Sequence, residues 1–125
     1  MTRRVFARGE IVHIEFPYPV DPAATGTIRK YVVVLQGGAY WDWSRTLLVA
    51  LITSQPQTRL WPHLAVIEPV DSGLRERSYI DCGDLHRLRR EILEAGNTIR
   101  HLSDGVMASV DRALVVGVGT ATPGS

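Results

Sequence analysis

The sequence predicts a small, mainly β domain in which a strongly curved antiparallel sheet closes into a barrel and carries one C-terminal amphipathic helix. Three observations support this fold class. Short apolar segments with strand-like alternation or β-branched composition follow one another along most of the chain. Glycine, proline and small polar residues separate these segments. A clear helical period occurs only near the C-terminus, where a helix can cover one face or one opening of the sheet.

The first half of the chain contains three candidate strands. Ile11–Phe16 alternates apolar and polar residues and stops before two prolines, which is typical of a half-buried strand. After a loop of small residues at Val20–Thr27, the β-branched segment Tyr31–Gln36 is expected to be buried on both faces. The aromatic segment Ala39–Arg45 is expected to form a helical turn before a third, buried strand at Leu47–Thr53.

The second half contains two further candidate strands and one less certain segment. Leu64–Ile67 is a short strand that ends before a proline, and Asp71–Glu76 is a turn around a glycine. Arg77–Leu88 is a strand that becomes polar toward its end. Arg89–Ile99 is ambiguous between a simple connection and a connection followed by a short strand near its end. Edge strands of such a sheet remain exposed, and a homodimer is expected to cover them.

The last element is an amphipathic helix. Ser103 is a good N-cap, and the Asp104 that follows it favours the positive end of the helix dipole. Apolar residues then recur at helical spacing, at Val106, Val110 and Leu114, with Met107 and Ala113 flanking them. Residues 117 and 119 are glycines that end the helix. We expect a single domain over residues 1–119 and a flexible tail at 120–125.

Composition indicates a globular protein but no particular binding partner. Hydrophobic residues make up 45% and charged residues 22% of the 125 residues, which is typical of a globular domain. The net charge of +1 neither favours nor excludes a nucleic-acid partner. Cys82 is the only cysteine, so no intramolecular disulfide is possible, and a reducing cytoplasm is the expected location. No apolar run reaches transmembrane length and no secretory signal is recognisable, so we expect no membrane association.

Several kinds of chemistry have no support in the sequence. One cysteine and four histidines on different elements do not suggest a metal site, and no cofactor-binding motif is present. No Gly-x-Ser-x-Gly motif occurs, so a hydrolase triad is not indicated. The histidines are His13, His63, His86 and His101.

Cations and hydroxyl groups occur at the ends of two expected strands. Arg29 and Lys30 start the second strand, where they fit either a clamp on a phosphate or two solvated charges. Thr53 and Ser54 end the third strand, where their hydroxyl groups fit either donors to the same anion or caps of a turn. If these residues meet on one rim of the barrel, they are sufficient to stabilise negative charge on a reacting phosphate.

A third polar cluster lies in the longest expected strand. Strand alternation places Asp84 and His86 on one face, and imidazole is suited to proton transfer near neutral pH. The alternative is a surface ion-pair cluster with the charged residues that follow, which are Arg89, Arg90, Glu91 and Glu94. The tryptophans fit either stacking on nucleic-acid bases or packing in a core or dimer interface; they are Trp41, Trp43 and Trp61.

These segments, in this order, resemble the MazF/PemK family of toxins. Arg8-Gly9-Glu10 matches the family's Arg-Gly-acidic opening of the first strand, and Val32–Gln36 matches its β-branched strand. Thr53 falls on the threonine that, with an arginine, contacts the scissile phosphate in the family. Gly83–Arg87 occupies the position of the family's acidic-Gln-hydrophobic-Arg-Thr segment, and Leu102–Asp104 matches the start of its closing helix. The resemblance implies a small SH3-like, CcdB-like β-barrel.

The same resemblance implies a function. A member of this family is expected to be a metal-independent, sequence-specific endoribonuclease, the toxin of a toxin–antitoxin pair. It would cleave single-stranded RNA, mRNA above all, to a 2′,3′-cyclic phosphate and a 5′-hydroxyl, and so arrest translation and growth. It would act as a homodimer whose groove takes RNA or the C-terminal segment of a cognate antitoxin.

The residues that match the family's motifs are the expected site. Lys30 or Arg29, Thr53, and Asp84 or His86 are the expected catalytic residues. The expected RNA-binding residues are Arg8, Ser54, Arg87 and Trp41.

The chain departs from the family pattern at the cation and at the acid. Lys30 stands where the family has arginine, with Arg29 one residue earlier, so the charge is kept but the bidentate fork is lost. The family's acidic position falls on Gly83, with Asp84 shifted by one residue. The loss of the arginine at Lys30 favours an alternative function, a non-catalytic toxin or binding module of the same fold that acts on a protein target such as a gyrase.

Overall fold

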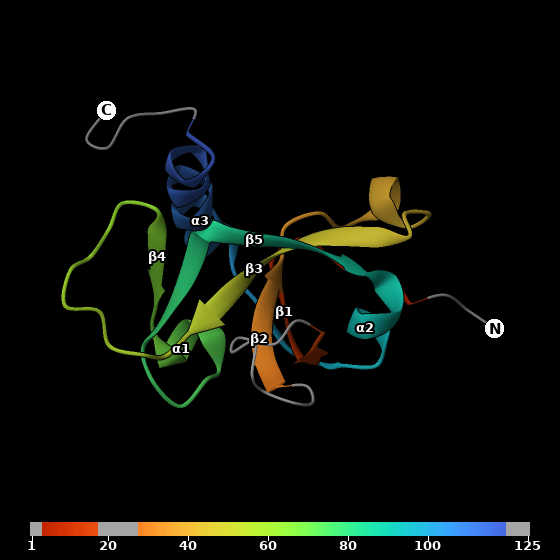
Figure 1. Cartoon of the computed structure of the whole chain (residues 1–125), viewed down its shortest axis with the longest axis horizontal. Helices are drawn as coiled ribbons and strands as arrows, with labels where there is room; N and C mark the ends of the chain where they lie inside the picture. Colours follow the sequence, from red (N-terminus) through yellow and green to blue (C-terminus); the bar gives the residue numbers. More distant parts are fainter. Residues whose placement is uncertain (1–3, 18–27, 120–125) are drawn as a thin grey trace.

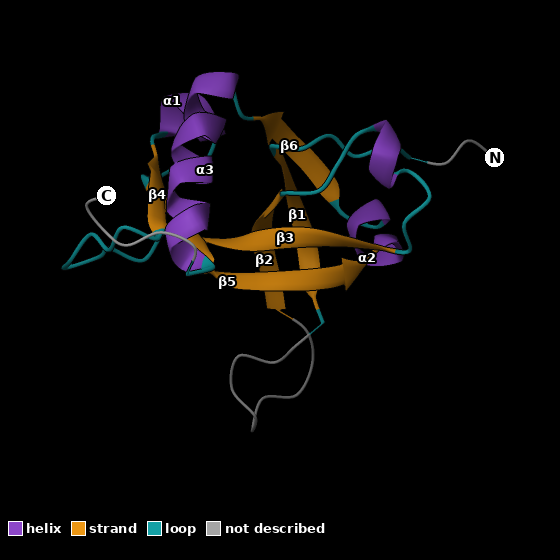
Figure 2. Cartoon of the chain, turned by 90° about the horizontal axis from the view of Figure 1, so that it is seen from above, coloured by secondary structure: helices purple, strands orange, loops and turns teal. Residues whose placement is uncertain are grey.

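Six strands form one antiparallel sheet in the order β4-β5-β3-β2-β1-β6 (Figure 1). The structure is a computed structural model that describes residues 4–17 and 28–119. The strands are β1 (Glu10–Phe16), β2 (Ile28–Val34), β3 (Thr46–Thr53), β4 (Leu64–Ile67), β5 (Ser78–Arg89) and β6 (Asn97–His101). Figure 2 shows the helix α3 (Asp104–Gly117) at the β4 side of the sheet and the short helix α2 (Arg90–Glu94) at the far end of β5.

This architecture is the mainly β fold with a C-terminal helix that the sequence predicts, and the sheet is curled into a half-barrel. The expected strands are present, with ends that differ by a few residues. The expected helical turn is a single 3₁₀ turn at Ala39–Trp41. The loop expected at Val20–Thr27 and the tail at 120–125 lie outside the described residues.

Two short helices were not expected. The turn expected at Asp71–Glu76 is partly the helix α1 (Pro69–Ser72), which ends at Gly73 with φ of 74°. The ambiguous segment Arg89–Ile99 contains α2 before β6 begins. Both helices are a single turn long, so neither has room for the apolar period that identifies a helix in a sequence.

Because the sheet is curled, it buries apolar side chains on both faces. One cluster lies between the sheet and α3 and includes Ile52, Ile80 and Val110. The other lies on the opposite face and includes Phe16, Val49 and Leu93 of α2. Apolar packing on both faces therefore holds the central strands in place, and this fixes the position of the polar residues at their ends.

The helix α3 begins as predicted and buries the predicted apolar residues to different extents. The Ser103 side chain accepts a hydrogen bond from the backbone N–H of Val106 at 3.3 Å, which confirms the N-cap. The buried side chains are Met107, Val110 and Ala113, whereas Val106 and Leu114 of the expected stripe are only partly buried at its edges. All five expected apolar residues therefore pack on the core, and the face is centred on Val110.

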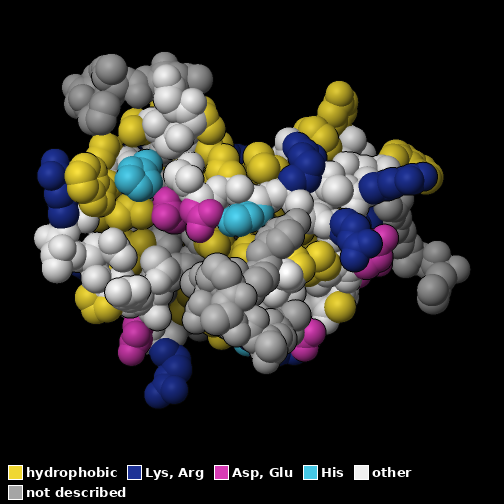
Figure 3. All heavy atoms as spheres, in the orientation of Figure 1, with side chains coloured by type: hydrophobic (Ala, Val, Ile, Leu, Met, Phe, Trp, Pro, Cys, Tyr) yellow, Lys and Arg dark blue, Asp and Glu magenta, His cyan; other side chains and the backbone are white. Residues whose placement is uncertain are grey.

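Strand β5 contains a bulge that shapes one face of the molecule. Ala50 of β3 pairs with Leu85, but its neighbour Leu51 pairs with Asp81, so residues 82–84 bulge out of the ladder. The end of α3 packs directly on this bulge: a Cβ added to Gly117 would lie 2.1 Å from the carbonyl oxygen of Cys82. Figure 3 shows histidine and acidic side chains in a row across this part of the surface.

Arg90 joins three distant segments of the chain. Its side chain is 2% exposed and donates to the backbone carbonyl oxygens of Ser44 at 3.1 Å, Arg4 at 3.0 Å and Trp41 at 2.8 Å. Its guanidinium also lies 5.7 Å from the centre of the Phe6 ring. A buried charge is tolerable here because these carbonyl groups replace the water that it loses.

Candidate active site

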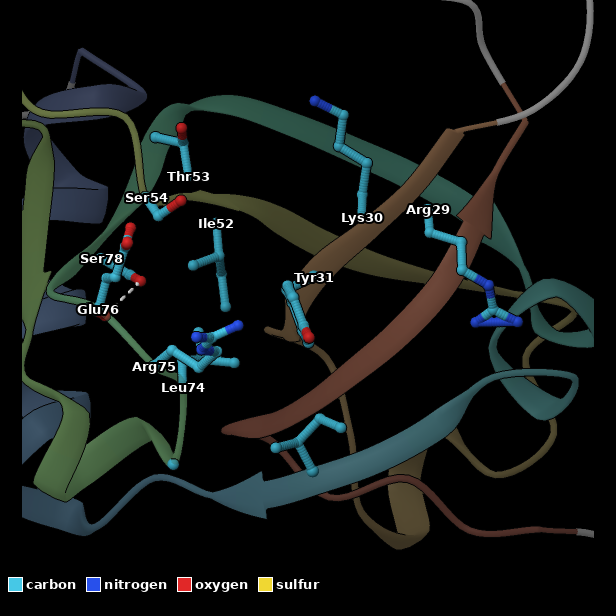
Figure 4. A pocket seen from close by; sticks show the side chains of 12 residues that line it. Arg29, Lys30, Tyr31, Ile52, Thr53, Ser54, Leu74, Arg75, Glu76 and Ser78 are labelled. Atoms are coloured by element: carbon cyan, nitrogen blue, oxygen red, sulfur yellow. Dashed lines mark hydrogen bonds between the residues drawn. The ribbon is translucent and has the colours of Figure 1, made fainter.

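A pocket of about 720 Å³ opens where β2 begins and β3 ends (Figure 4). Lys30 and Tyr31 line it from β2, and Thr53 and Ser54 line it from the end of β3. The loop between α1 and β5 contributes Arg75. The pocket therefore gathers cations and hydroxyl groups from segments that are far apart in the sequence.

Lys30 and Thr53 lie on the same side of the sheet at this pocket. Tyr31 pairs with Ile52, so one further step of the same register places Lys30 opposite Thr53. Figure 4 shows the Lys30 and Thr53 side chains on one side of the strands, and Tyr31 and Ile52 on the other. Both residues are half-buried. The structure thus brings together the cation and the hydroxyl group that the sequence places at two strand ends.

The polar atoms of this pair are available to a ligand. Among the residues that the structure describes, Lys30 makes no hydrogen bond or ion pair. The Thr53 hydroxyl oxygen accepts a hydrogen bond from the backbone N–H of Gln55 at 3.2 Å, so it caps the following turn. Its own proton remains free for donation to an anion in the pocket.

Arg29 also lines the pocket, but its side chain points in a different direction from that of Lys30. It pairs in register with Glu15 of β1 and is exposed, and Figure 4 shows its side chain directed away from Thr53. Burial and then the positive charge of Arg29 lower the pKa of His13 from its ordinary value of 6.5. The His13 ring stacks on Tyr31 with centroids 4.2 Å apart. Arg29 therefore belongs to the opposite face from Lys30, as strand alternation requires.

Asp84 and His86 form a pair on β5 but do not line the pocket. His86 Nε2 lies 2.7 Å from Asp84 Oδ1, and the imidazole packs edge-on against Phe16 with centroids 5.0 Å apart. His86 pairs with Val49, four residues before Thr53, which corresponds to about 13 Å along β3. The structure therefore joins Asp84 to His86 and keeps both some distance from Lys30 and Thr53.

Comparison with models of known protein families identifies the family of this chain. Residues 7–117 match the model of a family described as "PemK-like, MazF-like toxin of type II toxin-antitoxin system". The chain belongs to this family. Comparison with curated protein sequences finds no significant match.

Several solved structures share the fold of this PemK-like, MazF-like family member. An endoribonuclease in complex with its cognate antitoxin from a mycobacterial species has a TM-score of 0.71 at 16% identity and covers 93% of this chain and 97% of its own. The MazE–MazF structure from Deinococcus radiodurans (Form III) has a TM-score of 0.71 at 20% identity, with coverage of 93% and 98%. The Mycobacterium tuberculosis toxin MazF-mt6 has a TM-score of 0.65 at 16% identity, with coverage of 86% and 94%.

The other residues that the sequence predicts for RNA binding lie in different settings in this toxin-family chain. Ser54 lines the pocket beside Thr53, whereas the other three do not. Arg8 forms an ion pair with Asp111 of α3, and Arg87 donates a hydrogen bond to the hydroxyl group of Thr46 at 3.1 Å. Trp41 is half-buried against the apolar cluster that contains Phe16.

The surface ion-pair cluster, which was the alternative for the polar stretch of β5, does not form among the described residues. Across residues 4–17 and 28–119, Asp84 pairs with His86, and Arg89, Glu91 and Glu94 form no ion pair. Arg90 is buried instead of exposed. Within the described part of the chain, no group of three histidine, cysteine or acidic side chains is placed to hold a metal ion, and no helix is long and apolar enough to cross a membrane.

Sequence reasoning missed two features of this region. Arg75 lies in the pocket because the turn after α1 folds back over β2 and β3, and nothing in its local sequence signals that. His63 lies next to Asp81, with 3.7 Å between His63 Nε2 and Asp81 Oδ1. That pair spans β4 and β5, so it depends on strand register, which a single sequence does not reveal.

Proposed function

We propose that the protein is a metal-independent, sequence-specific endoribonuclease that cleaves single-stranded RNA as the toxin of a type II toxin–antitoxin pair. The observation that carries this proposal is the meeting of Lys30 and Thr53 in one pocket, half-buried and facing the same side of the sheet. A positive charge and a hydroxyl donor at one point are suited to an anion whose charge increases during reaction. Membership of the toxin family supports the same assignment.

The reaction needs no metal because RNA supplies its own nucleophile. The 2′-oxygen attacks the adjacent phosphorus, the bond from phosphorus to the 5′-oxygen breaks, and the products carry a 2′,3′-cyclic phosphate and a 5′-hydroxyl. Lys30 stabilises the charge on the phosphate oxygens and Thr53 donates a hydrogen bond to one of them. The 2′-hydroxyl loses its proton and the departing 5′-oxygen gains one. Asp84 and His86 are the pair predicted for this transfer, which requires an RNA-bound arrangement that closes the about 13 Å between His86 and Thr53 along β3. The exposed Arg29 is available to a neighbouring phosphate.

The partners follow from this role. The substrate is single-stranded mRNA in the cytoplasm, and a cognate antitoxin would block the toxin by occupying the same groove. Two of the structural neighbours are complexes of a toxin with its antitoxin, which supports such a partner. Strands β4 and β6 are the two edges of the sheet, and a homodimer would cover one of them.

The test is cleavage of a long single-stranded transcript by the purified protein in the presence of EDTA. Wild-type protein should cut the transcript. The double variant Lys30→Ala/Thr53→Ala should lose cleavage, since each removed donor is expected to cost about 10²- to 10³-fold in rate. The matched control is Arg112→Ala/Ser109→Ala, which removes a cation and a hydroxyl group that bond to each other on α3, away from the pocket. Equal cleavage by the two double variants would contradict the assignment.

A second function is favoured by one observation: Lys30 stands where the family resemblance implies an arginine. A lysine offers a point charge and no bidentate fork, so the site is less suited to a phosphate in its transition state. A non-catalytic toxin that binds a protein target would then arrest growth on expression without cutting RNA. Growth arrest together with intact RNA in the EDTA assay identifies this alternative.

A further inference from the structure

Two aromatic side chains between β2 and β3 stand almost entirely in solvent. Tyr40 is 86% exposed and Trp43 is 85% exposed, which makes them the most exposed aromatic residues in the described part of the chain. Trp41 between them is half-buried, and its ring packs edge-on against that of Tyr40 with centroids 5.2 Å apart. Large aromatic rings usually bury most of their surface, so two exposed rings this close together indicate a contact surface.

The backbone that carries these rings is fixed to the rest of the molecule. The buried Arg90 side chain donates to the carbonyl oxygens of Trp41 at 2.8 Å and Ser44 at 3.1 Å. The N–H of Gly38, just before the turn, donates to the carbonyl oxygen of Phe6 at 2.7 Å. A ligand that stacks on the rings therefore does not have to order the turn first, which lowers the cost of binding.

Three exposed arginines lie beside the two rings. Arg45 follows Trp43 by two positions. Arg89 of β5 pairs in register with Thr46, and Arg87, on the same face of β5, donates to the Thr46 hydroxyl group at 3.1 Å. Figure 3 shows basic and hydrophobic side chains together on the surface over this end of the sheet. The aromatic–arginine patch consists of Tyr40, Trp43, Arg45, Arg87 and Arg89.

The charges of the patch favour a single-stranded nucleic acid. Among the described residues, the side chains of Arg45 and Arg89 make no hydrogen bond or ion pair, and the nearby acidic residues are the half-buried Asp42 and the exposed Glu91. Guanidinium groups match phosphate oxygens, and aromatic rings stack on unpaired bases of any sequence. Phosphates and unpaired bases alternate along a single strand, so one ligand satisfies both kinds of group.

The patch lies at the opposite end of β3 from the pocket. Thr46 beside the patch and Thr53 in the pocket are the first and last residues of β3, which corresponds to about 23 Å. No residue of the patch lines the pocket. An RNA strand that occupies both places must therefore extend over several nucleotides, and the patch can act on binding but not on the reacting phosphate.

We propose that the aromatic–arginine patch is a second binding surface for single-stranded RNA, which holds the strand outside the cleavage pocket. The choice of RNA as the ligand rests on the proposed ribonuclease function. Bases stack on Tyr40 and Trp43, and the three arginines contact the phosphates between them.

The first experiment measures binding of a fully 2′-O-methylated single-stranded oligonucleotide, which lacks the nucleophile for cleavage. Tyr40→Ala/Trp43→Ala should weaken binding at least about 10-fold, because two stacking surfaces are lost. Arg45→Gln and Arg89→Gln should each reduce the slope of log Kd against the logarithm of salt concentration by about 0.7, the value for one phosphate contact. Arg112→Gln is the matched control, since it removes an exposed charge on α3, and should leave the slope unchanged.

A second experiment locates the contact and separates binding from catalysis. Trp43→Phe keeps an aromatic ring, so it should retain most of the affinity but lose the quenching of tryptophan fluorescence that a stacked base causes. In cleavage of a long transcript in EDTA, Tyr40→Ala/Trp43→Ala should raise KM and leave kcat unchanged. Both side chains are exposed, so the variants should fold, which circular dichroism checks.

The outcomes distinguish the patch from the cleavage function. Wild-type affinity and salt slope in the folded patch variants would overturn this inference, as would a failure of the wild-type protein to bind the oligonucleotide. A changed oligomeric state of Tyr40→Ala/Trp43→Ala in sedimentation would assign the patch to a protein interface and overturn it as well. Binding that depends on the patch, without cleavage of a transcript, would support the patch and contradict only the ribonuclease function.

Discussion

Gly117 at the end of α3 offers a strict test of how the helix supports the bulge of β5. A Cβ added there would lie 2.1 Å from the carbonyl oxygen and 2.6 Å from the carbonyl carbon of Cys82, and 3.2 Å from the N–H of Gly83. All three neighbours are backbone atoms, so no side chain can rotate to make room. Gly117→Ala must therefore move the end of α3 away from the bulge, or move the bulge.

The expected magnitude follows from two opposing effects. Overpacking of a well-packed contact costs about 1–3 kcal/mol. Alanine in place of glycine in a helix returns about 0.5–1 kcal/mol, and less at the last helical residue. The net loss in the free energy of unfolding is about 1–2 kcal/mol, which corresponds to a fall in Tm of roughly 4–8 °C for a chain of this size.

The same helix contains the control. An added Cβ at Gly105 meets only the Ser103 hydroxyl oxygen, at 4.0 Å, so Gly105→Ala should be neutral or stabilise by up to about 1 kcal/mol. Urea denaturation followed by circular dichroism measures both variants. Gly117→Ala should also lower RNA cleavage, because Asp84 of the proposed proton-transfer pair adjoins the displaced backbone. A Gly117→Ala protein as stable as wild type would refute the close contact on which this reasoning depends.

Three further predictions concern other parts of the fold. Arg90→Ala should cost about 3–5 kcal/mol in denaturant unfolding, because three partly buried carbonyl groups lose a charged donor, whereas the exposed Arg89→Ala should cost almost nothing. Burial raises the pKa of the Cys82 thiol from 9.0 to about 11. The folded state therefore favours the neutral thiol, and the stability that this contributes is complete below about pH 9 and is lost as the pH rises toward 11. Alkaline unfolding of Cys82→Ala should lack that loss. The pKa of His13, lowered by burial and by Arg29, should rise in Arg29→Ala when followed by NMR.

The fold was predictable where local pattern and tertiary structure agree. The alternation of Ile11–Phe16 and the cap at Ser103 each specify an element from its own residues, and both are present. The helix α2 was not predictable, because a single turn whose buried residues are Arg90 and Leu93 carries no apolar period. The order of the strands in the sheet is likewise a property of long-range pairing.

The candidate site was predictable in part. Thr53 lies at the end of β3 and Lys30 near the start of β2, and these two strands are neighbours in the sheet. Their meeting therefore follows once the register between the two strands is known. Asp84 and His86 share a face, as alternation indicates, and form their own pair. The contact of His63 with Asp81 and the entry of Arg75 into the pocket depend on a bulge and on a turn folding back, and neither leaves a periodic signal.

The three hydrogen bonds of the buried Arg90 side chain affect the order in which parts of the chain can fold. Its carbonyl partners in Arg4, Trp41 and Ser44 are separated from it by 86, 49 and 46 positions along the chain. Contacts of such long range form late and slowly, since large loops must close first. A nascent chain therefore cannot make the hydrogen bonds of Arg90 to Arg4, Trp41 and Ser44 until residue 90 has left the ribosome, although Phe6 can already bond to Gly38.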